Sequence, residues 1–182
     1  MPFWKRIGFA FVFIVPALMP LAAWLGARFQ QPALMAWFPL FFLFVLLPLA
    51  DHAVGHDASN PDADLAGQLE RDRWFRLLTL LAVPVQFATL GWSMQHALTA
   101  GFSLPGMLGW VLSQGGVGGV LAINVAHELI HKDTTLERGA GGMLLTSVGY
   151  HGFKVEHLRG HHVHVSTPLD ASSARRGQSL WH

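Results

Sequence analysis

The feature that most constrains this chain is a set of four long stretches that contain no Asp, Glu, Lys or Arg. They cover residues 7–27, 33–50, 77–98 and 102–126. Each approaches or exceeds the ~18–20 apolar residues that cross the hydrocarbon core of a bilayer. Unpaired backbone groups are costly in lipid, so we expect helices even where prolines interrupt the stretches. The sequence therefore predicts an all-α, polytopic membrane protein with about four transmembrane helices.

The composition supports a membrane class. Hydrophobic residues make up 52% of the 182 residues and charged residues 13%, about half the charge usual in soluble proteins. The chain has no cysteine, which excludes disulfides, zinc–thiolate sites, iron–sulfur ligation and cysteine nucleophiles within it. We expect one membrane domain over residues 1–182, with a histidine-rich region at 124–182.

Basic residues predict the orientation of the spans. With four spans, eleven of the twelve Lys and Arg residues fall on one side, and only Arg28 falls on the other. The positive-inside rule then places the N-terminus, the 51–76 loop and the histidine-rich region in the cytoplasm. Lys5 and Arg6 resemble the start of a signal peptide, but the apolar stretch that follows is longer than usual and three more spans come after it. We expect the first span to be retained. The membrane topology accounts for the positions of the basic residues along the chain. No feature of the sequence predicts nucleic-acid binding.

Five histidines follow the fourth stretch in two clusters. They are His127, His131, His157, His161 and His162. Imidazole is the commonest metal ligand near neutral pH. A purely structural role would not require two clusters of histidines with the same spacing. Without thiolates, such a site suits iron, zinc, copper or nickel. The clusters predict a metal held at the membrane surface.

Helical spacing predicts how these side chains are arranged. His127 and His131 are four residues apart and share one face of an α-helix, and His157 and His161 repeat that spacing. His162 lies about 100° further round, at a second metal or at another position on the same one.

Three polar residues near the histidines are candidates for a supporting role. Glu128 and Glu156 each adjoin a first histidine, where they would orient imidazoles or bridge metals. Asn124 is a polar residue within the fourth span, one turn before His127, and such residues usually face the protein interior.

Two other functions remain open on the residues alone. His127–His131 reads HExxH, the motif in which two histidines of a membrane metalloprotease bind zinc and a glutamate activates water. That enzyme would not need the histidines of the second cluster. A membrane protein that transports metal through the histidines is the non-enzymatic alternative.

A turn follows the second cluster. Pro168 disfavours helix at Thr167, so the cluster helix is expected to end there. Thr167 as N-cap, Pro168 as first residue and Asp170 in the first turn predict the start of a new helix.

Taken together, N-V-A-H-E-L-I-H-K and E-H-L-R-G-H-H-V-H-V-S-T-P-L-D resemble the integral-membrane alkane 1-monooxygenases of the fatty-acid desaturase/hydroxylase superfamily. The similarity extends upstream through L-P-L-A-D-H-A-V-G-H-D, from about residue 46. Three residues separate His157 from His161, as in the hydroxylase branch, whereas typical desaturases have two. This spacing favours hydroxylation.

The resemblance implies a six-span enzyme of the bacterial inner membrane with two non-haem iron ions at its cytoplasmic face. It would use O2 and electrons from a rubredoxin-like donor to hydroxylate the terminal carbon of an alkane. Carried over, His127, His131, His157, His161 and His162 are iron ligands, and Asp170 supports them. A xylene-type side-chain monooxygenase and a fatty-acid desaturase are close alternatives.

The family's third histidine cluster and its last two spans do not occur in these 182 residues. Two irons need on the order of eight ligands, and five imidazoles do not supply them. We therefore expect the second iron site to be incomplete here, and the chain to be a truncated portion that is inactive alone.

Overall fold

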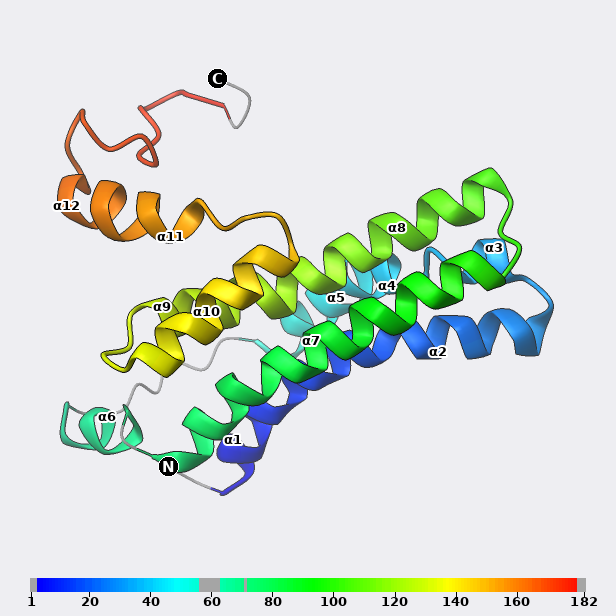
Figure 1. The fold of residues 1–182 in the computed structure, drawn as a ribbon, viewed down its shortest axis with the longest axis horizontal. Helices are drawn as coiled ribbons and strands as arrows, with labels where there is room; N and C mark the ends of the chain where they lie inside the picture. The colour runs from blue at the N-terminus through cyan, green and yellow to red at the C-terminus, as the bar shows by residue number, and fades with distance from the viewer. Residues whose placement is uncertain (1–2, 56–62, 71, 180–182) are drawn as a thin grey trace.

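The computed structural model describes residues 3–55, 63–70 and 72–179. Within them, four helical spans are long and apolar enough to cross a membrane: Phe3–Phe29, Pro32–Val54, Arg73–Thr99 and Leu104–Ile130. The predicted all-α architecture with about four transmembrane helices is confirmed. The spans run beside one another, and the C-terminal segment lies across one end of the bundle (Figure 1).

Several spans are built from shorter helical pieces. The first combines α1 (Phe3–Gly8), a 3₁₀ segment η1 (Phe9–Phe13) and α2 (Ile14–Phe29). The second combines α3 (Pro32–Met35), α4 (Phe38–Phe41), a π-helical segment η2 (Phe42–Leu46) and α5 (Leu47–Val54). The third is the single helix α7 (Arg73–Thr99), and the fourth joins α8 (Leu104–Gly118), a π-helical segment η3 (Gly119–Ile123) and α9 (Asn124–Ile130).

Local sequence explains where these helices begin and end. Gln30 adopts the left-handed conformation that ends α2, and Pro32 opens α3 after it. The Asp72 side chain caps α7 by accepting a hydrogen bond from the Trp74 backbone N–H at 2.9 Å. The second span continues to Val54, so residues 51–54 are helical, although we expected them to belong to the 51–76 loop. Residues 56–62 lie outside the described part of the chain.

In the described part of the chain, four shorter helices lie outside the spans. They are α6 (Ala63–Glu70), α10 (Thr135–Ser147), α11 (Phe153–Val155) and α12 (His162–His164); a π-helical segment η4 (Glu156–His161) joins the last two. Helix α10 folds back along α9, and the α11–η4–α12 segment crosses above both (Figure 1).

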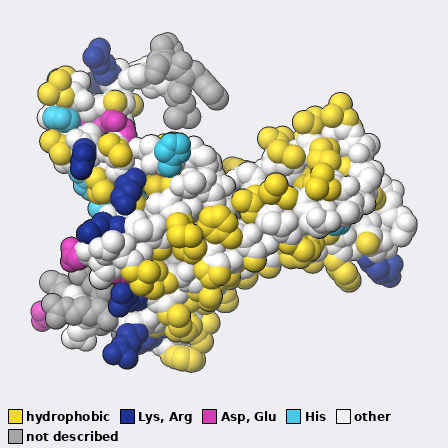
Figure 2. Space-filling view, in the orientation of Figure 1, with side chains coloured by type: hydrophobic (Ala, Val, Ile, Leu, Met, Phe, Trp, Pro, Cys, Tyr) yellow, Lys and Arg dark blue, Asp and Glu magenta, His cyan; other side chains and the backbone are white. Residues whose placement is uncertain are grey.

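Close packing holds α10 against the end of the fourth span. Leu129 and Ile130 of α9 and Leu144 and Leu145 of α10 are all buried in one apolar core. Gly141 allows this approach, because a Cβ there would lie 2.9 Å from Ile130 Cγ2. Large apolar side chains cover much of the outward surface, as expected of helices that face lipid. Basic side chains and histidines gather mainly at the end that carries α9 and α10 (Figure 2).

Candidate metal centre

The end of the fourth span presents the first two histidines. His127 lies in α9 and His131 caps its C-terminus, with ring centroids 5.1 Å apart. Both side chains are exposed, while Leu129 and Ile130 between them are buried against α10. The spacing of four residues thus places both imidazoles on the open face of α9, as expected from the sequence. The core on the opposite face fixes the orientation of that face.

The second cluster lies directly over this pair. His157 Nε2 is 2.8 Å from His127 Nε2, 3.1 Å from His131 Nε2 and 3.0 Å from His162 Nε2. Ligand atoms of these four histidines all lie within 4.8 Å of one another. The four residues come from two segments that are about 30 residues apart in sequence, so the tertiary fold creates the group.

The histidines in this group are not the ones that α-helical spacing predicts for the second cluster. His162 belongs to it, whereas His161 does not. The segment Glu156–His161 is a π-helix, in which hydrogen bonds join residues five apart instead of four. His157 and His162 therefore share a face, whereas the His161 ring stacks beside His157, with centroids 5.6 Å apart, and bonds to a different partner. The α-helical register expected from the spacing is wrong for this segment.

His161 has a different partner. Its Nδ1 lies 2.9 Å from Asp170 Oδ2, and the side chain of Asp170 is 1% exposed. Asp170 also accepts hydrogen bonds from Ser173 Oγ at 2.5 Å and from the Ser172 backbone N–H at 2.9 Å. The Ser173 hydroxyl, the Ser172 amide and His161 hold the pKa of Asp170 below its usual value, against the opposing effect of burial. An anionic Asp170 fixes the His161 ring and leaves its Nε2 available.

The turn that carries Asp170 replaces the helix expected after Pro168. Helix α12 ends at His164, and the described residues from Val165 to Ser179 form turns and bends. The Leu169 N–H does lie 3.3 Å from Thr167 Oγ1, as an N-cap would require. The chain then turns back because the Asp170 carboxylate is engaged by His161 and by the serines that follow it.

The donor set of the four-histidine group fits a metal ion. Each neutral imidazole has one N–H donor and one acceptor nitrogen, so His157 Nε2 cannot form three good hydrogen bonds at once. Four nitrogens bound tetrahedrally at ~2.0–2.1 Å from one ion would be about 3.3–3.4 Å apart. The three distances to His157 Nε2 are 2.8–3.1 Å, and all four ligand atoms lie within 4.8 Å of one another. A cation between the rings accounts for a convergence that hydrogen bonding does not.

The pKa values of the group support the same conclusion. Burial, and then the neighbouring imidazoles, lower the pKa of His157 from its ordinary 6.5 to about 4. Burial is also the largest cause that lowers the pKa of His131, followed by His162 and His127. The lowered pKa values of His157 and His131 favour the neutral form of these two rings, which is the form that binds metal.

The polar candidates do not join the group. Glu128 Oε1 forms an ion pair with Lys132 Nζ at 2.5 Å, and its side chain is 56% exposed. Asn124 Nδ2 donates to Val120 O within its own helix at 2.8 Å, and Glu156 is exposed. The Glu128–Lys132 pair argues against the protease alternative, because that glutamate would have to face the metal-bound water.

Sequence reasoning missed two contacts that support the group. The Phe153 ring stacks on His157, with centroids 4.7 Å apart; an aromatic residue four positions before a histidine is the signal. Arg76 Nε of α7 forms an ion pair with Glu137 Oε1 at 3.2 Å. Thr134 caps α10, because its Oγ1 accepts a hydrogen bond from the Glu137 backbone N–H at 3.2 Å. The Thr134–Glu137 spacing is that of a capping box and would have predicted the start of α10.

Comparisons with known proteins indicate the family of the chain. Residues 102–182 match the family model described as fatty acid desaturase. The chain is 44% identical to alkane 1-monooxygenase 2 of Alcanivorax borkumensis, over 97% of this chain and 47% of the relative. It is also 44% identical to alkane 1-monooxygenase 2 of Pseudomonas aeruginosa, over 97% of this chain and 48% of the relative.

A more distant relative is the xylene/toluene monooxygenase hydroxylase component of Pseudomonas putida, 33% identical over 87% of this chain and 38% of the relative. The chain spans about half the length of the alkane monooxygenases it matches. The histidine group lies within the segment matched by the family model. On these grounds the chain belongs to the alkane 1-monooxygenase family, within the fatty-acid desaturase superfamily.

Proposed function

We propose that this chain contributes to a non-haem diiron monooxygenase that hydroxylates the terminal carbon of alkanes or similar hydrocarbon chains with O2. The observation that carries the proposal is the convergence of three imidazoles on His157 Nε2. The relatives to which it is similar are alkane 1-monooxygenases. An all-imidazole set at the end of a membrane span suits an iron enzyme that acts on an apolar substrate.

His127, His131, His157 and His162 would hold one iron. His161, oriented by Asp170, would offer Nε2 to a second iron, whose remaining ligands are not among these five histidines. Glu128, Glu156 and Asn124 remain proposed supporting residues. Bound iron would supply the chemistry that activates O2 for insertion into a C–H bond.

The residues of this chain position and shield the reacting groups. Phe153 stacks on His157 and restricts its rotation. The apolar core of α7, α9 and α10 excludes water from the side of the group that faces the membrane.

The orientation and the electron donor are also part of the proposal. Arg6 and Arg76 lie at the same end of the bundle as α9 and α10, linked through Asp72 and Glu137. By the positive-inside rule, this end faces the cytoplasm of a bacterial inner membrane. Electrons would then come from a soluble, rubredoxin-like protein.

Side-chain hydroxylation of an aromatic hydrocarbon is the second candidate, and the similarity to the xylene/toluene enzyme favours it. The two functions share the metal centre and differ in the substrate. Fatty-acid desaturation is a third outcome that the same metal would support.

Metal analysis of the chain in lipid nanodiscs tests the proposal. We expect iron to bind anaerobically at the four-histidine group, with loss of binding in H127A. Supplied with a rubredoxin and its reductase, a protein that contains this chain and the remaining iron ligands should convert octane to 1-octanol. Zinc at one per chain, with peptide hydrolysis and no O2 consumption, would instead support the protease. Metal transport without O2 consumption would support the transporter.

A further inference from the structure

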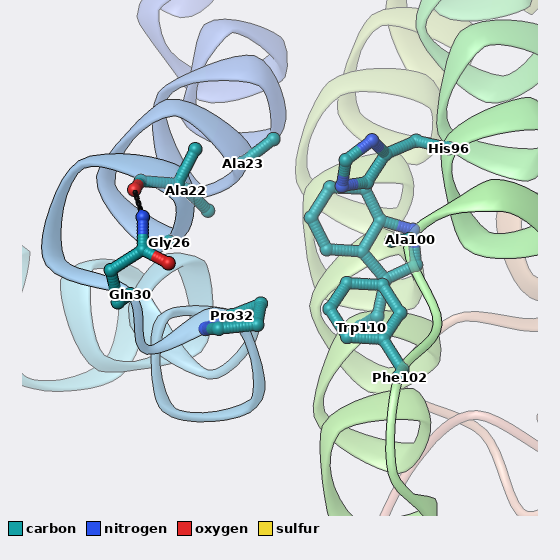
Figure 3. Close-up of a pocket in the computed structure, with 10 residues that line it drawn as sticks. Ala22, Ala23, Gly26, Gln30, Pro32, His96, Ala100, Phe102 and Trp110 are labelled. Carbon is teal, nitrogen blue, oxygen red and sulfur yellow. Dashed lines mark hydrogen bonds between the residues drawn. The ribbon is translucent and has the colours of Figure 1, made fainter.

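The end of the bundle opposite the histidine group contains a cavity of about 240 Å³. It lies between the C-terminal part of α2 and the adjoining ends of α7 and α8 (Figure 3). Ala22, Ala23 and Gly26 form one wall, and His96, Phe102 and Trp110 form the other. The lining is mainly apolar, so the cavity would accept a molecule that partitions into the membrane.

The two walls hold the cavity open. Small residues on α2 leave the space unfilled, and Gly26 packs so closely on the next helix that a Cβ there would lie 3.0 Å from Pro32 Cα. On the other wall, Trp110 Nε1 donates to Ser93 O at 3.1 Å. The ring of Phe102 packs on Trp110, with centroids 5.4 Å apart. The aromatic wall is therefore rigid, and its rings cannot swing in to fill the space.

His96 provides the one imidazole in this lining. Its ring packs on Trp110, Trp92 and Phe102, with centroids 4.8, 5.4 and 5.8 Å away. Among the described residues the ring has no hydrogen-bond partner, although it is partly buried. A ring nitrogen without a protein partner can bond to a polar group of a ligand. Figure 3 shows the ring on the side of α7 that faces α2, where a ligand in the cavity would meet it.

The cavity is separate from the histidine group. Trp110 and His127 lie on the same continuous fourth span and are 17 residues apart. At 1.5 Å per residue this separation is about 25 Å. A molecule of the size the cavity admits cannot reach the metal-binding nitrogens from here.

The cavity is partly open to the surface, so its volume indicates how much of a ligand it can hold. An apolar cavity of roughly 150 Å³ accepts a benzene ring of six carbons. By proportion, the present cavity takes about ten non-hydrogen atoms. We propose that it binds a medium-chain alkyl alcohol, whose chain lies between the alanine wall and the aromatic wall and whose hydroxyl group bonds to a ring nitrogen of His96. This proposal is independent of the metal chemistry at the other end.

Photolabelling of the full chain in nanodiscs tests the site. The probe is an octanol that carries a diazirine on its alkyl chain, and its twin lacks the hydroxyl group. We expect adducts concentrated in residues 22–32 and 96–110. Ala23→Phe fills the cavity and should lower this labelling several-fold, whereas Ala88→Phe, at an exposed position of α7 outside the lining, should not.

His96→Phe distinguishes recognition of the hydroxyl from simple partitioning. It should lower labelling by the alcohol several-fold and leave labelling by the hydroxyl-free twin unchanged. If Ala23→Phe loses helix content by circular dichroism, Ala27→Phe at the cavity lining replaces it. Adducts spread evenly over the lipid-facing helices in every variant would overturn the site. Equal loss of both probes in His96→Phe would overturn the role of the imidazole.

Discussion

Replacing His162 by alanine should weaken metal binding far more than replacing its neighbour His161. His162 Nε2 lies 3.0 Å from His157 Nε2 inside the four-nitrogen group, whereas His161 is bonded to Asp170 outside it. Removal of a group that only supports a ligand costs about 10–100-fold in metal affinity. Because His162 supplies a donor atom itself, H162A should lose at least about 100-fold, or about 2.8 kcal/mol at 1.4 kcal/mol per tenfold.

His161→Ala should change the affinity for the first metal ion by no more than about tenfold, because all four nitrogens of the group remain. Asp170→Asn should behave similarly, since it acts on the group only through His161. The measurement is an anaerobic competition titration of Fe²⁺ between the chain in nanodiscs and a chromophoric chelator. His151→Ala, at an exposed histidine outside the group, is the matched control.

Comparing H161A with H162A distinguishes a π-helical from an α-helical register in this segment. An α-helical segment would place His161 beside His157 and rotate His162 away. If H161A lost as much affinity as H162A, or if H162A kept the parent affinity, the π-helical register would be refuted. The helix content by circular dichroism should be the same in all variants, which separates loss of a ligand from loss of fold.

Three further predictions concern stability. The pKa of His157 is about 4 in the folded, metal-free chain, below its ordinary 6.5, so the unfolded state binds more protons between these pH values. The free energy of unfolding should therefore fall as the pH drops from about 6.5 towards 4. Unfolding measured at each pH tests this, and a free energy that does not change with pH would contradict it. Arg76→Ala should lower the free energy of unfolding in detergent by roughly 1–2 kcal/mol, because it leaves the buried Glu137 carboxylate without its cation. The cost is smaller than for a fully buried ion pair, because Arg76 is half exposed. An unchanged free energy of unfolding would show that solvent screens the pair. Gly141→Ala should lower the free energy of unfolding by about 1–3 kcal/mol, because the added methyl group crowds Ile130. Gly139→Ala lies on the same helix with open space around its Cβ, so it should be neutral or stabilising. Equal effects at both positions would contradict the packing argument.

The sequence is sufficient to predict the parts of this fold that depend on local periodicity. Four charge-free stretches predicted the spans, because a bilayer imposes a minimum length on every crossing helix. The pairing of His127 with His131 followed from ordinary α-helical spacing. Both predictions rest on interactions within about one helix.

The remaining features depend on contacts between distant segments. The Asp170 carboxylate turns back to His161, so the helix expected after Pro168 does not form among the described residues. The π-helical turn at Glu156–His161 has no equally clear residue signal, and one added residue per turn is enough to exchange His161 for His162. The approach of α10 to α9 was not predicted, although Gly141 and the Thr134–Glu137 capping box were visible in the sequence.

The π-helical turn has a consequence for how histidine spacings are compared among related proteins. Five residues along a π-helix bring a side chain back to nearly the same face that four residues reach along an α-helix. A sequence with one residue fewer in this segment, as in the typical desaturase spacing, would present its last histidine to the same point from an α-helix. The extra residue would then be absorbed as a local change of pitch, and two sequences of different length would deliver the same ligand. The number of residues between the histidines would thus indicate the type of helix, while the same histidines would bind the metal.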